Sequence, residues 1–132
     1  MKIVYKVWLD QDGKAFGDGP FELLKRVENT DSLHEAAHQM GMSYSKAWCL
    51  IRTMEQRLGF HLIERQVGGS SGGGSWITPE GKDLMARYEQ FRKDVERSLN
   101  RVYEKHFTRK IVSSRSQRRR TDHGFPMEAR KP

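Results

Sequence analysis

Residues 31–59 have the sequence DSLHEAAHQMGMSYSKAWCLIRTMEQRLG, which predicts two helices joined by a tight turn. Ser32 followed three residues later by Glu35 is a capping box, the pattern of a helix start. Gly41 suits the turn, and Ser43 is the expected N-cap of the longer second helix. The apolar residues recur at helical spacing and should be buried: Leu33, Ala36, Ala37, Met40, Ala47, Ile51, Met54 and Leu58. A short helix, a glycine turn and a longer helix together form a helix-turn-helix.

The same stretch contains His34-Glu35 followed by His38, the H-E-x-x-H pattern in which two histidines bind zinc and the glutamate acts as a general base. Glu35 already has a capping role, however, and Tyr44 stands where the longer protease pattern has its third histidine. The helix is also expected to end at Gly41. We therefore expect no metal, no cofactor, no catalytic residue and no enzymatic activity, and a zinc hydrolase is kept only as an alternative.

The residues before this stretch predict a strand pair and a helix. In residues 2–19, KIVYKVWLDQDGKAFGDG, the alternation of Ile3, Tyr5 and Val7 with their neighbours predicts a strand, and Asp12-Gly13 predicts a turn into a short second strand. GPFELLKRVENT, residues 19–30, follows as a helix. Pro20 suits its first position, and Phe21, Leu24 and Val27 recur at helical spacing.

The residues after it predict a hairpin and one long helix. FHLIERQV and SWITP are strand-like segments separated by the glycine-rich GGSSGGGS, which is expected to be the flexible tip of a hairpin. Thr78-Pro79 then predicts a helix start. Its apolar residues average 3.6 positions apart up to about His106, forming the stripe Leu84, Tyr88, Phe91, Val95, Leu99 and Val102.

This order of elements predicts a mostly α-helical chain with a small β component, a winged helix-turn-helix with a long C-terminal dimerisation helix. We expect residues 1–77 to form the winged domain with its N-terminal strand pair and residues 78–107 to form the dimerisation helix. Residues 108–132 are expected to be a basic, mostly disordered tail. Arg118, Arg119 and Arg120 belong to this tail, which is either a solvated arm or a source of non-specific phosphate attraction.

Charge and composition narrow the class of protein. Of the formal net charge of +7, the segment from Arg109 to Pro132 contributes +6, because eight basic residues and two acidic ones lie there. A nearly neutral body with a basic tail indicates an anionic partner without identifying it. The single cysteine, Cys49, excludes an internal disulfide and fits a reducing cytoplasm. No apolar run approaches the length of a membrane span, so we expect no membrane partner, and the first residues lack the features of a secretion signal.

The exposed face of the second helix carries the candidate binding residues. If the apolar stripe faces the core, the opposite side presents Ser45, Lys46, Cys49, Arg52 and Thr53, with Tyr44 at the leading edge. The N-terminal part of such a helix enters the major groove of DNA. Arg65 and Gln66 follow at the base of the hairpin. An ordinary solvated helix face is the alternative for this surface, and Trp48 is expected in the core rather than as a base-stacking group.

Residues 40–88 resemble the N-terminal DNA-binding domain of ModE-type molybdate-responsive regulators and, more distantly, the LysR-type winged helix. The resemblance rests on Ser43-Tyr44 with Ala47-Trp48, on Glu64-Arg65, on the Gly68-Gly69 to Gly72-Gly73-Gly74 run, and on Thr78 with Gly81. It covers roughly residues 3–100 and implies a homodimer that binds double-stranded DNA, with most dimer contacts in the long helix. The resemblance does not imply a molybdate site in this chain, because only the basic arm follows the long helix.

The sequence therefore predicts a cytoplasmic, sequence-specific transcriptional regulator. The expected DNA contacts are Ser43, Tyr44, Ser45, Lys46, Cys49, Arg52, Thr53, Arg57, Arg65, Gln66, Gly69, Ser70 and Ser71. The expected dimer contacts are Leu84, Tyr88, Phe91, Val95, Leu99 and Val102. A winged-helix module that binds protein is the second class of function that these residues allow.

Overall fold

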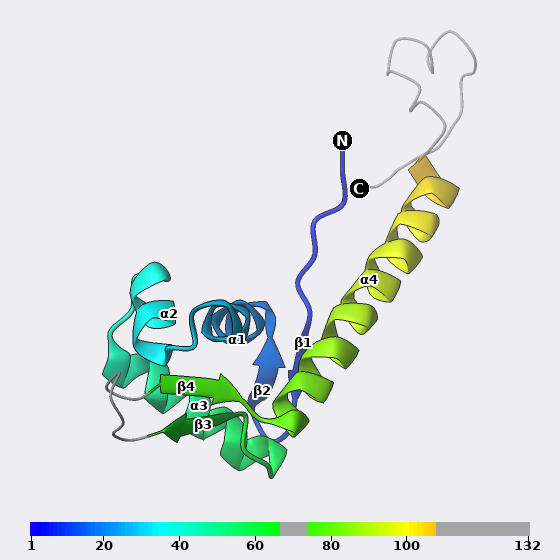
Figure 1. Ribbon diagram of the computed structural model, residues 1–132. Helices are drawn as coiled ribbons and strands as arrows, with labels where there is room; N and C mark the ends of the chain where they lie inside the picture. Colours follow the sequence, from blue (N-terminus) through cyan, green and yellow to red (C-terminus); the bar gives the residue numbers. More distant parts are fainter. Residues whose placement is uncertain (67–73, 108–132) are drawn as a thin grey trace, which may run out of the picture.

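The computed structural model describes residues 1–66 and 74–107 (Figure 1). Its elements follow in the order β1 (Trp8–Asp10), β2 (Lys14–Gly17), α1 (Asp18–Thr30), α2 (Leu33–Gln39), α3 (Tyr44–Leu58), β3 (Ile63–Gln66), β4 (Gly74–Ile77) and α4 (Pro79–Phe107). Three helices and two small hairpins surround one core, and α4 leaves this body and projects away from it (Figure 1). The predicted fold class, a winged helix-turn-helix with a long C-terminal helix, is confirmed.

Both caps of the helix-turn-helix form as the sequence predicts. The Ser32 hydroxyl accepts a hydrogen bond of 2.9 Å from the backbone N–H of Glu35, and the Ser43 hydroxyl accepts one of 3.1 Å from that of Lys46. Between the helices Gly41 has a φ of 70°, a left-handed conformation that glycine adopts without steric cost. The predicted apolar residues Leu33, Ala36, Ala37, Ala47, Ile51 and Met54 are buried, and Met40 and Leu58 pack against their margin.

The first strand is shorter than predicted, so the expectation of a strand through Ile3, Tyr5 and Val7 is wrong. β1 begins only at Trp8, which pairs with Gly17 at the end of β2. The next residue, Asp18, already belongs to α1, so residues before Trp8 have no strand beside them to pair with. Residues 1–7 instead run alongside α4 (Figure 1), and the Tyr103 hydroxyl donates a 2.7 Å hydrogen bond to the Met1 carbonyl.

Helix α1 begins earlier than predicted. Its first residue is Asp18, which places Pro20 in the third position rather than the first. The first N–H groups of a helix have no partner within the helix, so proline is tolerated there. Phe21, Leu24 and Val27 are buried as expected.

The hairpin of β3 and β4 forms the wing, as predicted, with Ile63 opposite Ile77 and Gln66 opposite Gly74. Its glycine-rich segment, residues 67–73, lies outside the described residues. The Ser75 N–H attaches the wing to the body by donating to the Asp31 carbonyl at 3.0 Å. Within the hairpin, the Thr78 N–H donates to the Leu62 carbonyl at 2.9 Å, one pair beyond Ile63 and Ile77. The Thr78 hydroxyl caps α4, as predicted, by accepting from the Gly81 N–H at 2.9 Å.

Helix α4 has two parts with different surroundings. Its first turns close the core, where Met85 and Tyr88 are buried and Leu84 packs against them. The rest carries Phe91, Val95, Leu99 and Val102 beyond the body; Phe91 and Val102 are 40% and 54% exposed. The prediction that Tyr88 supplies a dimer contact is therefore wrong: its ring fills the core of its own chain, where it packs on Phe16 and Phe21.

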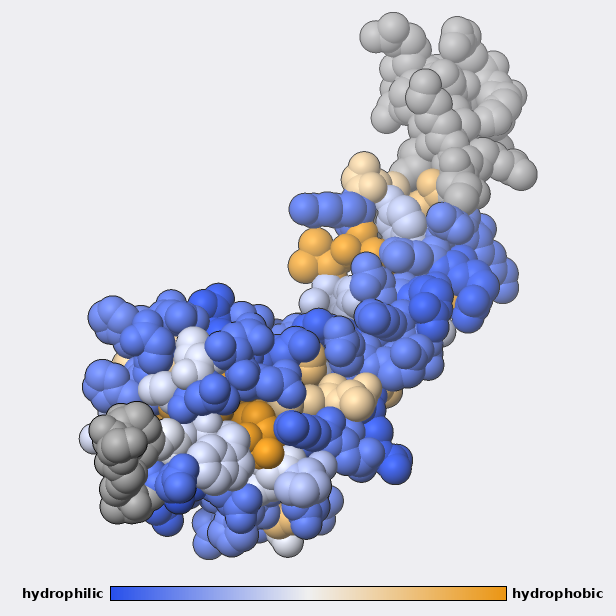
Figure 2. Space-filling view, viewed as in Figure 1, coloured by the Kyte–Doolittle hydropathy of each residue, from blue (hydrophilic) through white to orange (hydrophobic). Residues whose placement is uncertain are grey.

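The surface of the body is mostly polar, and apolar side chains show more along the projecting region (Figure 2). None of the helices in residues 1–66 and 74–107 combines the length and apolar character needed to cross a bilayer. The basic tail, residues 108–132, lies outside the described residues.

Candidate nucleic-acid interface

The polar face of α3 is open to solvent. Because Ala47, Ile51 and Met54 hold one side of the helix in the core, the other side is turned outward. The predicted contact residues Ser43, Ser45, Lys46, Cys49, Arg52 and Thr53 are all exposed. Neither Lys46 nor Arg52 points inward, so the geometric condition for reading a DNA groove with this helix is met.

Trp48 lies between the polar face and the core. It is half-buried and packs against the core cluster, as predicted. Its indole ring also has two guanidinium groups over it, with the Arg52 Cζ 5.2 Å and the Arg65 Cζ 5.3 Å from a ring centroid. Both distances are within the range of a cation–π attraction. Trp48 therefore joins a cation of α3 to a cation of the wing, a contact that helical periodicity could not indicate.

Tyr44 completes this cluster. Its hydroxyl accepts a 2.8 Å hydrogen bond from the Arg65 guanidinium, and its ring meets Trp48 edge-on with centroids 6.3 Å apart. Burial acts to raise the pKa of the Tyr44 hydroxyl, but Trp48 and Arg65 favour the ionised form and outweigh it, so the pKa lies below its usual value. The His34 ring of α2 lies 5.6 Å from that of Tyr44.

The wing presents Arg65 toward α3 and leaves Gln66 exposed at its described end. Arg65 pairs with Ser75 across the hairpin, while the neighbouring pair, Glu64 and Trp76, projects from the opposite face. The structure thus brings Arg65 to the predicted α3 residues. Gly69, Ser70 and Ser71, which were also predicted to contact DNA, lie outside the described residues.

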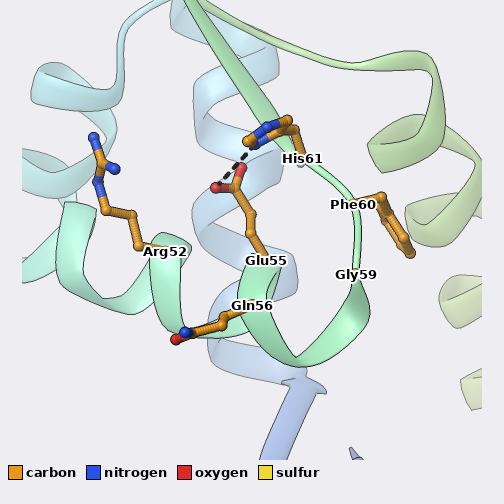
Figure 3. A pocket seen from close by; sticks show the side chains of 6 residues that line it. All are labelled: Arg52, Glu55, Gln56, Gly59, Phe60 and His61. Atoms are coloured by element: carbon orange, nitrogen blue, oxygen red, sulfur yellow. Dashed lines mark ion pairs between the residues drawn. The ribbon is translucent and has the colours of Figure 1, made fainter.

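A concave surface borders the C-terminal half of α3. It has a volume of about 550 Å³ and is lined by Arg52, Glu55, Gln56, Gly59, Phe60 and His61 (Figure 3). Glu55 and His61 face each other with 3.5 Å between Oε1 and Nδ1, while Arg52 and Phe60 point to opposite sides. Gln56 and His61 are exposed candidates that the sequence reasoning did not include. Gln56 could have been found, since it lies one turn after Arg52.

Glu55 holds the wing to α3. Its Oε2 accepts hydrogen bonds from the backbone N–H groups of Leu62 at 2.7 Å and Ile63 at 3.3 Å. Only 11% of its side chain is exposed, and a carboxylate so placed is strongly engaged by those donors. The concave surface is therefore built around a structural carboxylate.

Arg57 does not lie with the other predicted contacts. Its guanidinium donates a 2.7 Å hydrogen bond to the Lys14 carbonyl and covers Gly13 in the turn between β1 and β2. The structure thus gives it a bracing contact at the far end of α3.

The histidines of the H-E-x-x-H pattern, His34 and His38, are both exposed on α2. Within residues 1–66 and 74–107, no three His, Cys, Asp or Glu side chains come together as metal ligands would. His34 instead packs on Tyr44, so it belongs to the aromatic cluster beside α3.

Comparison with known proteins gives matches over the helix-turn-helix and the wing. Residues 20–82 match the family model described as bacterial regulatory helix-turn-helix protein, lysR family. The chain is 31% identical over 105 residues to the molybdenum transport protein ModE of Azotobacter vinelandii, covering 79% of this chain and 39% of that protein. It is 37% identical over 89 residues to the DNA-binding transcriptional dual regulator ModE of Escherichia coli (strain K12), covering 62% and 34%.

A third relative is the molybdenum-pterin-binding protein MopB of Rhodobacter capsulatus, 32% identical over 94 residues that cover 71% of this chain and 35% of that protein. The chain spans at most 39% of the length of these three relatives. The Escherichia coli relative is named as a DNA-binding transcriptional regulator, which agrees with the expectation of a regulator rather than an enzyme.

Two solved structures share the fold. A CbnR DNA-binding domain in complex with DNA has a TM-score of 0.52 and 18% identity, covering 67% of this chain and 95% of that one. A BenM DNA-binding domain with benA site 1 DNA has a TM-score of 0.50 and 19% identity, covering 69% and 97%. The resemblance inferred from the sequence is confirmed: residues 20–82 match the helix-turn-helix model of the lysR family, the chain is similar in sequence to ModE proteins, and it shares its fold with two solved DNA-binding domains.

Proposed function

We propose that this chain binds double-stranded DNA sequence-specifically as a homodimer and so regulates transcription. The observation that carries the proposal is the meeting of the polar face of α3 with Arg65 of the wing on one surface. In this arrangement the N-terminal part of α3 enters the major groove, where base edges can be distinguished. Ser45 and Lys46 are the proposed base contacts, and Arg52 reaches a base or a phosphate.

Arg65 acts on the DNA backbone in this proposal. Cations that neutralise phosphates release counterions, so affinity falls steeply as salt rises. The wing adds contacts beside the groove that α3 occupies, because β3 approaches α3 at Arg65. The CbnR and BenM domains, which share this fold, are themselves in complexes with DNA. That likeness agrees with the proposal.

The projecting part of α4 supports the proposed homodimer. Phe91, Val95, Leu99 and Val102 lie on one apolar stripe beyond the body. Among the described residues, seven of the eight large hydrophobic side chains that are exposed belong to residues 1–8 or to α4. A surface of this kind is typically covered by another protein surface. A second copy would cover both stripes through a two-fold axis and place two recognition helices about 34–36 Å apart.

Molybdenum appears in the names of several relatives, but the match covers only about a third of those proteins. We propose DNA binding for the described residues and no oxyanion site among them. The cytoplasm is the proposed location, because a regulator of this kind acts where the DNA lies.

The proposal is tested by mapping the DNA that the chain binds across its genome. A duplex from the strongest site is then titrated with the purified full chain by fluorescence anisotropy. We expect saturable binding that is lost on an unrelated duplex of equal length. A Lys46→Ala, Arg52→Ala double variant should bind at least about tenfold more weakly, because two charged contacts are removed.

The matched control removes two exposed cations of α4, Lys82→Ala with Arg87→Ala, and should leave affinity within about twofold. If the Lys46→Ala, Arg52→Ala variant binds as well as the control, the α3 face is not the contact surface. If the unaltered chain binds no mapped duplex, the winged helix is a protein-interaction module instead.

A further inference from the structure

We propose that Trp48 and Tyr44 are positioning residues. They hold Arg65 of the wing against the recognition helix α3 in the protein without DNA. The inference rests on the DNA-binding function proposed above and deepens it. It assigns these two aromatic residues a role through Arg65 rather than through direct contact with bases.

The first support is the double stack on Trp48. Arg52 and Arg65 come from different elements, α3 and β3, yet both place their guanidinium carbons within 5.3 Å of the indole ring. Each guanidinium is attracted to the same indole ring, which favours the presence of two like charges on one small surface. Among the described residues, no carboxylate forms an ion pair with Arg52 or Arg65. The carboxylates that do form ion pairs there are paired with other basic residues. Two converging cations without a carboxylate are suited to an anionic partner such as the DNA backbone.

The second support is the hydrogen bond that fixes Arg65 from its other side. The Tyr44 hydroxyl accepts from the Arg65 Nη1 at 2.8 Å, and Tyr44 itself is braced edge-on by Trp48. Tyr44 and Trp48 lie four positions apart on α3, so a single helical turn presents both. An arginine held by a ring and a hydroxyl has already lost rotamer freedom that binding would otherwise remove. Helix and wing then meet DNA as one preformed surface.

Two other roles must be distinguished from this one. Trp48 also packs on the core, so its truncation could weaken DNA binding merely by loosening the fold. Tyr44 is half-buried at the leading edge of α3 and could contact DNA itself. In both cases the effect of the aromatic residue would not depend on whether Arg65 is present.

Double-mutant cycles separate these roles. The affinity of the full chain for the mapped duplex is measured for three variants, Tyr44→Phe, Trp48→Phe and Trp48→Leu. Each variant is measured once with Arg65 present and once combined with Arg65→Ala. We expect Tyr44→Phe and Trp48→Leu each to weaken binding about 3- to 10-fold when Arg65 is present and less than about twofold when it is absent. Trp48→Phe, which keeps a ring, should fall between Trp48→Leu and the unaltered chain. Trp76→Leu, on the outer face of the wing, is the matched aromatic control and should show no coupling to Arg65.

A second measurement needs no DNA. The order parameter of the Arg65 side-chain Nε–H, obtained by NMR relaxation, should be close to that of rigid backbone and should drop in Tyr44→Phe and Trp48→Leu. Thermal unfolding of each variant shows that it remains folded. If the fold-changes of the single variants simply multiply in the double variants, or if Arg65 is mobile in the unaltered chain, the positioning role is excluded. If the unaltered chain binds no duplex while Arg65 is rigid, the proposed function is wrong, but Trp48 and Tyr44 still hold Arg65 in place.

Discussion

The hydroxyl of Tyr88 donates a 2.6 Å hydrogen bond to the carboxylate of Asp18, which joins α4 to the first residue of α1. The Arg92 guanidinium donates to the same oxygen at 3.0 Å and lies over the ring of Phe21. These contacts join α4 to α1 near the point where α4 leaves the body (Figure 1). They fix the direction in which the proposed dimer helix projects.

The Asp18 contacts should make stability depend on pH. The hydrogen bond from Tyr88 lowers the pKa of Asp18, burial opposes it, and the hydrogen bond and charge of Arg92 lower it further, so the pKa lies below 3.8 when folded. A lowered folded pKa contributes stability that is present above about 3.8 and is lost as the pH falls through the folded value. Asp18→Asn should therefore be destabilising at pH 7, and its difference from the unaltered chain should shrink toward pH 3. Urea unfolding at several pH values measures this, with Asp83→Asn, which removes an exposed ion pair, as the control. A difference that stays constant with pH would contradict it.

Gly81 should tolerate no side chain. A Cβ there would lie 2.8 Å from the Leu62 carbonyl oxygen and 2.8 Å from the Ile77 Cγ2. The carbonyl belongs to the backbone and accepts from Thr78, so it cannot move aside cheaply. Gly81→Ala should cost about 1–3 kcal/mol of unfolding free energy despite the better helix propensity of alanine. Gly19→Ala in α1 is the control, since a Cβ there meets nothing within 4 Å, and it should be neutral or stabilising. Equal thermal midpoints for the two variants would refute the steric argument.

Arg57 and Arg52 are both cations of α3, but we expect Arg57 to affect mainly stability and Arg52 to affect mainly DNA binding. Arg57→Ala loses the hydrogen bond to the Lys14 carbonyl and should lower the unfolding free energy by about 1 kcal/mol. It should leave the dependence of DNA affinity on salt unchanged. Arg52→Ala should reduce the slope of log affinity against log salt by about 1 and alter stability less. Anisotropy titrations at four salt concentrations and thermal unfolding distinguish the two, and a reduced salt slope in Arg57→Ala would restore it as a phosphate contact.

The projecting stripe of α4 should carry association between copies. Val102 is 54% exposed in the single chain, so Val102→Asp should leave the fold intact. In the proposed dimer the new carboxylate would be buried without a partner, and light scattering should then show a monomer at concentrations where the unaltered chain is dimeric. Glu96→Gln, an exposed position of the same helix, is the control and should stay dimeric. A Val102→Asp chain that remains dimeric would place the interface elsewhere.

Much of the fold could be predicted because its signals are local. The caps at Ser32 and Ser43, the turn at Gly41 and the start of α4 at Thr78 depend on residues within four positions of one another. The exposed face of α3 followed from the same periodicity that buries Ala47 and Ile51. The first strand was overestimated because alternation shows that a segment can be a strand, not that a neighbour exists to pair with it.

The sequence by itself determined the helix-turn-helix, the wing and the polar face of α3, since helical spacing and capping act along a few residues of chain. Only the tertiary structure decided that Tyr88 belongs to the core, that Arg57 braces a turn, and that Arg65 stacks on Trp48. Those outcomes depend on residues 70, 43 and 17 positions apart, and their meeting is set by how the helices and the wing pack on one core. No local pattern encodes these contacts, because the partners are far apart along the chain and meet only in the packed fold.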